Sequence, residues 1–194
     1  MGAATSAAFP APVVLVGPMA VGKSAIGQQL AALCGAEFVD TDVSIVAEHG
    51  SIAGIFSARG EIGFRDIEAR QVSASLDAAR KHSTVISLGG GAVLDTGTQQ
   101  LLAECTVVYL EGDLDTVRER ILRNSGRPML SGDAINRWTE LMDVRRPVYE
   151  RLADIVYDVR KGTIEELARG LEQKLQDFHA PGHGLEAAQE EEQK

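Results

Sequence analysis

The chain has 194 residues, of which 44% are hydrophobic and 24% charged, a composition typical of one globular domain with short tails. Its formal net charge of −9 argues against a nucleic-acid-binding protein, which would carry a basic patch or stripe. No apolar run approaches the roughly 20 residues of a membrane span, and residues 1–12 lack the basic residues of a targeting peptide. We therefore expect a cytoplasmic protein without nucleic-acid or membrane partners.

Short apolar runs alternate with helical patterns along the chain. The expected strands are 13–16, 37–40, 84–88, 106–110 and 155–157. The expected helices are 24–34, 61–81, 115–123, 134–146 with a stop at Pro147, and a last helix that opens with a capping box of Thr163 and Glu166. This alternation predicts an α/β fold in which helices cover both faces of a parallel sheet. Cys34 and Cys105 lie in apolar surroundings and lack metal-ligand spacing, so we expect reduced thiols.

Residues 17–24 read GPMAVGKS, a match to the phosphate-binding pattern G-x-x-x-x-G-K-S between a strand and a helix. Glycines let backbone N–H groups turn toward phosphates, and the helix N-terminus adds partial positive charge. Lys23 would reach the β- and γ-phosphates, and the Ser24 hydroxyl would bind Mg²⁺. The pattern predicts nucleotide binding.

The rest of the chain favours a small-molecule kinase over other nucleotide-binding proteins. It has no N-K-x-D segment, which marks guanine specificity in GTPases, and it is short for a motor domain. Arg120, Arg123 and Arg127 flank a flexible Asn-Ser-Gly stretch, as suits a lid that closes over phosphates. The alternative is a solvated loop with incidental arginines.

Four further patterns could form an acceptor site. Asp40 and Asp42 are expected on one face at the end of the second strand, where one would help to hold Mg²⁺ and the other would accept a substrate proton, unless they only cap the strand. Arg65 and Glu68 share a helix face, either as an oriented carboxylate-binding fork or as a surface ion pair.

Residues 89–91 are three successive glycines, which favour a close approach to a ligand over a plain turn. Arg145 shares a helix face with Trp138 and should point inward, although a cation near a helix C-terminus would be an alternative.

Taken together, these segments resemble the shikimate kinase family over nearly the whole folded chain. The matching pieces are the phosphate loop at 17–24, DTD at 40–42, FRDIE at 64–68, SLGGG at 87–91, Arg127-Pro128 and Arg145…Pro147-x-Tyr149. The resemblance implies a three-layer αβα P-loop kinase of the nucleoside-monophosphate kinase type, with a five-stranded parallel sheet in the order 2-3-1-4-5. It implies phosphorylation of the 3-hydroxyl of shikimate by ATP with Mg²⁺, a step of aromatic amino-acid biosynthesis.

The resemblance also assigns roles by position. The implied catalytic residues are Asp42 as the base, with Lys23 and Arg127 on the transferred phosphate. The implied shikimate-binding residues are Asp42, Phe56, Phe64, Arg65, Gly89, Gly90, Gly91 and Arg145. The implied nucleotide-binding residues are Gly17, Ala20, Val21, Gly22, Lys23, Ser24, Ala25, Arg120, Arg127 and Arg160. Ser24 and Asp40 would hold the metal, and Ser87 would bond one of its waters.

The expected organisation is a flexible tail at 1–12, a kinase domain at 13–178 and a disordered acidic tail at 179–194. Within the domain, the shikimate-binding region would span about 42–70 and the lid about 123–134, and the family is usually monomeric. Ala20 replaces a glycine of many relatives, with little expected effect. Arg146 adjoins Arg145 and is an alternative for its role. The rival functions are another small-molecule kinase, such as a gluconate kinase, and an inactive nucleotide- or shikimate-binding relative.

Overall fold

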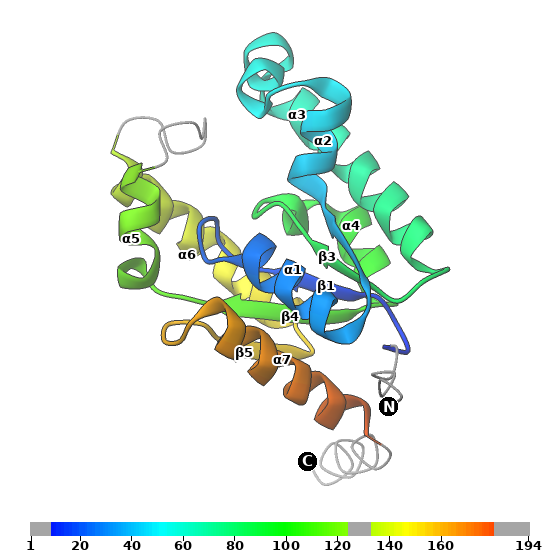
Figure 1. Ribbon diagram of the computed structural model, residues 1–194. Helices are drawn as coiled ribbons and strands as arrows, with labels where there is room; N and C mark the ends of the chain where they lie inside the picture. The colour runs from blue at the N-terminus through cyan, green and yellow to red at the C-terminus, as the bar shows by residue number, and fades with distance from the viewer. Residues whose placement is uncertain (1–8, 124–132, 181–194) are drawn as a thin grey trace, which may run out of the picture.

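Five parallel strands form the centre of the fold (Figure 1). The computed structural model describes residues 9–123 and 133–180. The strands are β1 (Val13–Val16), β2 (Glu37–Asp40), β3 (Thr84–Ser87), β4 (Thr106–Glu111) and β5 (Ile155–Asp158). Their order is β2-β3-β1-β4-β5, which confirms the prediction. Every side chain of the central strand β1 is buried, as expected for a strand covered on both faces.

Helices cover both faces of this sheet. Helices α1 (Lys23–Cys34) and α7 (Ile164–His179) pack against each other on one face, and α3 (Ile52–Ala79), α4 (Thr96–Leu102) and α6 (Ala134–Leu152) lie on the other (Figure 1). Right-handed crossovers place α1 on one face and α3, α4 and α6 on the other. The connection from β1 to β2 runs along the sheet in the opposite direction to the connections from β2 to β3, from β3 to β4 and from β4 to β5. Helix α5 (Leu114–Arg123) precedes α6, and the short η1 (Ala92–Leu94) precedes α4.

The structure differs from the predicted elements in two places. Residues Thr41–His49 form helix α2, which was not predicted. Helix α3 begins at Ile52, before the predicted start at residue 61, and has a kink at Gly60. Helix α6 also continues through Pro147 to Leu152. Pro147 and Asp143 are both on the exposed side of the helix, where the carbonyl that loses its intrahelical partner remains open to water.

A small hydrophobic cluster lies apart from the main core. Ile45 of α2 packs with Ile55, Phe64 and Ile67 of α3. These two helices join β2 to β3 at the edge of the sheet, and their separate cluster lets them project beyond the strand ends (Figure 1). In the two described ranges, no helix combines the length and the apolar character needed to cross a membrane.

Candidate active site

A cavity of about 610 Å³ opens at the carboxyl ends of the strands, the usual ligand-binding edge of a parallel sheet. One side is formed by the end of the phosphate loop and the start of α1, including Gly22, Lys23 and Ser24. The opposite side is lined by the acceptor-side residues Asp42, Phe56, Phe64, Arg65, Glu68, Gly89, Gly90, Gly91 and Arg145. The cavity therefore brings together two groups of residues that the sequence analysis considered separately.

The carbonyl groups of residues 17–21 in the phosphate loop are all bonded to side chains. The Lys23 ammonium donates to the carbonyls of residues 17 and 18, each at 2.9 Å. The Trp138 indole donates to the carbonyl of Met19 at 3.2 Å, and Arg120 donates to those of residues 20 and 21 at 3.1 and 3.3 Å. Gly22 caps α1 in the left-handed region (φ 111°) without a side-chain cap bond. With the carbonyls held, the loop and helix N–H groups can face an anion.

Ala20 adopts a backbone conformation that favours glycine. Its φ is 68°, the single positive φ of a non-glycine residue among those described. A Cβ in the left-handed region costs roughly 1–2 kcal/mol. The backbone at this position favours glycine, and the expectation that alanine has little effect here stays a prediction.

Ser24 and Asp40 lie side by side at the phosphate loop. The Ser24 hydroxyl donates to the Asp40 carboxylate at 2.5 Å. Strand β2 ends at Asp40, whose carboxylate also accepts the N–H groups of residues 42 and 43 as the N-cap of α2. The prediction that Asp40 and Asp42 share a strand face is wrong, because Thr41 already begins a helix.

These two oxygen donors fit a magnesium ion that is brought in with a nucleotide. Mg²⁺ usually takes one or two protein oxygens and completes its shell with water and phosphate oxygens. In the described ranges, no group of three or more His, Cys, Asp or Glu side chains could bind a metal by itself. Ser87 is buried at the end of β3, in register with Asp40.

The three glycines make room for charged side chains. A Cβ on Gly89 would lie 2.5 Å from a Glu68 oxygen and 2.8 Å from an Asp42 oxygen, and one on Gly91 would lie 2.3 Å from the Arg65 guanidinium. These contacts are shorter than real Cβ contacts, so a larger residue could not occupy either position without moving the charged groups. The close approach predicted for the glycines is therefore partly an approach to Asp42, Arg65 and Glu68 of the protein itself.

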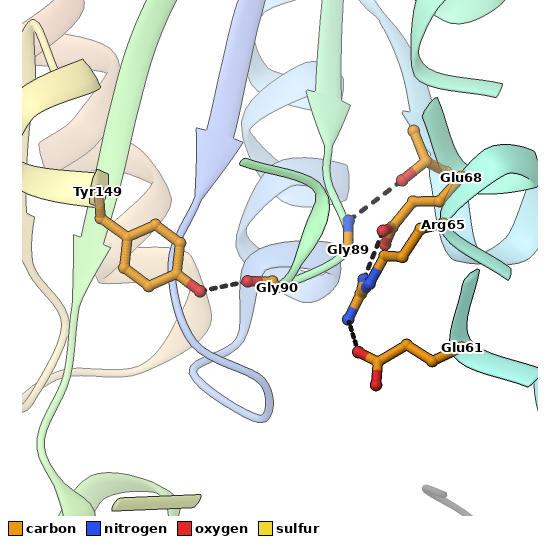
Figure 2. A network of polar contacts seen from close by, with 7 residues as sticks. Glu61, Arg65, Glu68, Gly89, Gly90 and Tyr149 are labelled. Carbon is orange, nitrogen blue, oxygen red and sulfur yellow. Dashed lines mark hydrogen bonds and ion pairs between the residues drawn. The ribbon is translucent and has the colours of Figure 1, made fainter. Parts of the chain in front are cut away.

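Glu68 holds Arg65 in place by an ion pair (Figure 2). The two side chains are joined at 2.5 Å, and Glu61 contacts the other guanidinium nitrogen at 3.4 Å. Glu68 is 3% exposed, so the alternative of a surface ion pair is wrong. Burial raises the pKa of the Glu68 carboxyl, while the nearby Arg65 lowers it. Burial has the larger effect on this pKa, and the pairing with Arg65 offsets part of it.

Arg145 is a second guanidinium at the acceptor end. It is 3% exposed, it lines the cavity, and its Nε has no hydrogen-bond partner in the described ranges. Burial lowers its pKa, and repulsion from Arg65 lowers it further. It lies two turns before the end of α6, so its alternative role as a C-terminal helix cation is wrong, and its neighbour Arg146 is exposed. Two guanidinium groups that face one cavity favour an anionic ligand.

The family model for shikimate kinase matches residues 19–176. The chain belongs to the shikimate kinase family. A shikimate kinase from Streptomyces coelicolor is 43% identical over 158 residues, which cover 81% of this chain and 91% of that protein. A relative from Mannheimia succiniciproducens with the same name is 37% identical over 87% of this chain and 97% of its own length.

Solved structures of the family share the fold. A shikimate kinase from Acinetobacter baumannii, in complex with shikimate, has a TM-score of 0.81 at 30% identity, over 87% of this chain and 94% of that chain. A gluconokinase from Sinorhizobium meliloti has a TM-score of 0.60 at 20% identity, over 89% and 95% of the two chains. This second likeness concerns the fold alone.

Most residues that the family resemblance assigned lie at the cavity. All eight implied shikimate-binding residues line it, as do Ala20, Gly22, Lys23, Ser24, Ala25 and Arg120. Gly17 and Val21 shape the loop behind it. Arg160 does not line it, because its guanidinium is bonded to Asp158 at 2.7 and 2.9 Å. Arg127 and most of the expected lid lie outside the described residues.

The sequence analysis missed several residues that build the site. Thr41 is fully buried, and its hydroxyl accepts the Gly89 N–H at 3.2 Å. Ile52 and Ile164 line the cavity from the starts of α3 and α7. Of these, only Thr41 could have been found, because Asp40 before it is a preferred N-cap residue and marks a possible helix start.

Proposed function

We propose that this chain is an ATP-dependent kinase that phosphorylates the 3-hydroxyl of shikimate to give shikimate 3-phosphate, a step of aromatic amino-acid biosynthesis. The observation that carries this proposal is the shared cavity. It has a phosphate loop at one side, two guanidinium groups at the other, and the Asp42 carboxylate on the acceptor side. Shikimate, a hydroxylated ring with one carboxylate, needs cations at one end and a proton acceptor at the other.

The arrangement supports in-line phosphoryl transfer. The substrate carboxylate would bind between Arg65 and Arg145, and its 3-hydroxyl would approach Asp42. The hydroxyl oxygen forms a bond to the γ-phosphorus as the bond from that phosphorus to the β,γ-bridging oxygen breaks, and Asp42 takes the hydroxyl proton. Lys23 stabilises charge on the β- and γ-phosphates. Ser24 and Asp40 would hold the Mg²⁺ that accompanies ATP, and this ion would neutralise phosphate charge.

Several finer assignments belong to this proposal. We infer a monomer that acts in the cytoplasm and has no nucleic-acid partner. Residues near 123–134 would form a lid whose Arg127 reaches the γ-phosphate, and Arg120 would stack on adenine. Residues 42–70 would form the shikimate-binding region. The monomer, the lid, the Arg120 role and the shikimate-binding region rest on the family resemblance. The nucleotide contact implied for Arg160 would require its guanidinium to leave Asp158.

Two rival functions leave residues of the site unexplained. A gluconate kinase shares this fold but has no evident need for both the DTD and the FRDIE segments. A binding-only relative would have lost catalytic groups, whereas Lys23, Asp42 and Arg65 are all present at the cavity.

A coupled assay of ADP release from MgATP tests the proposal directly. We expect strong stimulation by shikimate, none by gluconate, and loss of the signal when Mg²⁺ is chelated. Stimulation by gluconate would move the assignment to another kinase. If MgATP binds but neither acceptor increases ADP release, the kinase assignment is wrong.

A further inference from the structure

Tyr149 is a buried residue to which the proposed reaction assigns no role. It belongs to the Pro147-x-Tyr149 segment of α6, one turn after Arg145 on the same buried face. Its side chain is fully buried and stacks on Tyr109 of β4, with ring centroids 5.3 Å apart. Its hydroxyl donates a hydrogen bond to the carbonyl of Gly90, in the glycine turn that lines the cavity (Figure 2). Burial raises the pKa of this hydroxyl, so it remains a donor at neutral pH.

The other backbone groups of the glycine turn are also held, with two exceptions. The Gly89 N–H donates to Thr41, and the carbonyls of Gly89 and Gly91 accept the N–H groups of residues 92 and 94, each at 3.0 Å. Together with the hydrogen bond from Tyr149 to Gly90, this means that the carbonyls of all three glycines are hydrogen-bonded within the protein. The N–H groups of Gly90 and Gly91 have no hydrogen bond to any group in residues 9–123 and 133–180.

The planar peptide links the Tyr149 bond to one of these two N–H groups. The carbonyl of Gly90 and the N–H of Gly91 belong to the same trans peptide, in which the two bonds point in opposite directions. A carbonyl drawn toward α6 therefore turns the Gly91 N–H away from α6. Gly91 lines the cavity and Arg65 reaches it from α3, so an N–H turned away from α6 is on the Arg65 side of the turn.

We propose that Tyr149 is a positioning residue, which holds the glycine turn so that the N–H groups of Gly90 and Gly91 donate to oxygen atoms of the acceptor substrate. The inference rests on the proposed function for the identity of that substrate. Thr41 fixes the turn at Gly89 and Tyr149 fixes it at Gly90, one from each side. The acceptor is then held by two backbone donors in addition to the two arginines.

Replacement of Tyr149 by phenylalanine isolates the hydroxyl, because the ring and its stack on Tyr109 remain. Tyr157→Phe is the matched control: its hydroxyl also donates to a backbone carbonyl, that of Leu167 at 2.9 Å, but the residue does not line the cavity. Both variants lose one hydroxyl-to-carbonyl bond, but the Tyr149 hydroxyl is fully buried and also contacts Arg145, so Tyr149→Phe should lose more stability. Only the first should affect the acceptor site.

The kinetic experiment compares wild type, Tyr149→Phe and Tyr157→Phe. For Tyr149→Phe we expect KM for shikimate to rise about three- to tenfold, as one neutral hydrogen bond would give, with KM for ATP unchanged within about twofold. Tyr157→Phe should leave both constants unchanged. An unchanged KM for shikimate, or an equal rise for both substrates, would overturn the positioning role. Absence of shikimate-dependent turnover in wild type would instead refute the proposed function.

Amide spectra of protein labelled with ¹⁵N-glycine test the donors themselves and do not depend on the variant folding well. In wild type, shikimate should shift the Gly90 and Gly91 amide signals downfield, as expected for new hydrogen bonds. Glycines that do not line the cavity, such as Gly35 and Gly170, serve as internal controls. If the Gly90 and Gly91 signals do not move while shikimate binds, the inference is wrong.

Discussion

The indole N–H of Trp138 donates a hydrogen bond to the carbonyl of Met19, 3.2 Å away, and so joins helix α6 to the phosphate loop. Arg145 and Tyr149 lie further along the buried face of the same helix. One rigid helix therefore contacts both the nucleotide side and the acceptor side of the cavity. Substitutions along it should affect the two substrates separately.

Trp138→Phe should weaken nucleotide binding more than shikimate binding. Phenylalanine keeps most of the buried ring but leaves the Met19 carbonyl without its donor, so the loop is held less firmly. We expect the Kd for MgATP to rise about three- to tenfold and that for shikimate to change by less than about twofold, both measured by calorimetry. Equal weakening of both ligands would indicate a general loss of packing instead.

Arg65→Ala should raise KM for shikimate about 10- to 100-fold, because it removes a charge-assisted contact to the substrate carboxylate. KM for ATP should stay nearly constant. Arg70→Ala, on the exposed side of the same helix, is the control and should leave both constants unchanged. A parallel rise for shikimate and ATP would point to a folding defect.

Asp42→Asn should retain ATP binding and lose turnover by about 100-fold, since a positioned base contributes this much or more. The asparagine keeps the size of the side chain beside Gly89 but cannot take the proton. Asp66→Asn makes the same chemical change at an exposed position of α3 and should be neutral. A kcat near the wild-type value in Asp42→Asn would remove Asp42 from the base role.

Ala20→Gly should stabilise the protein by about 1 kcal/mol, because the strain of a Cβ at positive φ outweighs the extra entropy of glycine in the unfolded chain. Ala32→Gly, at an exposed position inside α1, is the opposite case and should destabilise by about 1 kcal/mol. Denaturant unfolding of the two variants measures both values. A loss of stability in Ala20→Gly would contradict the positive φ of this residue.

The two thiols should react slowly and make stability depend on alkaline pH. Burial raises the pKa of Cys34 and that of Cys105 to about 11. Each thiol holds its proton more tightly in the folded than in the unfolded chain, where its pKa is about 8.5. Their contribution to stability is therefore fully present below about pH 8 and lost as the pH rises toward 11.

Alkylation measures the same effect, because the thiolate is the reactive form. At pH 8, native protein should react with iodoacetamide about 100-fold more slowly than protein unfolded in urea. A native rate within about tenfold of the unfolded rate would show that these thiols are not held in their protonated form.

Local patterns were sufficient to predict much of the fold. The run Val13–Val16 and the GKS sequence that follows identify β1 and the start of α1, because β-branched residues favour extended backbone and the phosphate-loop pattern occurs between a strand and a helix. Helix α2 was missed, since its cap Asp40 ends a strand and the DTD segment reads equally well as extended chain. Pro147 was misread as a helix stop, because its exposure to water depends on tertiary structure.

The sequence by itself determined the chemistry of this protein: a phosphate loop, a carboxylate, two arginines and a glycine turn in a recognisable order. Only the tertiary structure decided how they meet. Whether Glu68 pairs with Arg65 in a buried position, and whether Trp138 and Tyr149 reach the carbonyls of Met19 and Gly90, depends on the packing of α3 and α6 against the sheet. The contacts of Trp138 and Tyr149 join residues far apart in sequence, so no local pattern predicts them, and the burial of the local pair of Arg65 and Glu68 is set by the same packing.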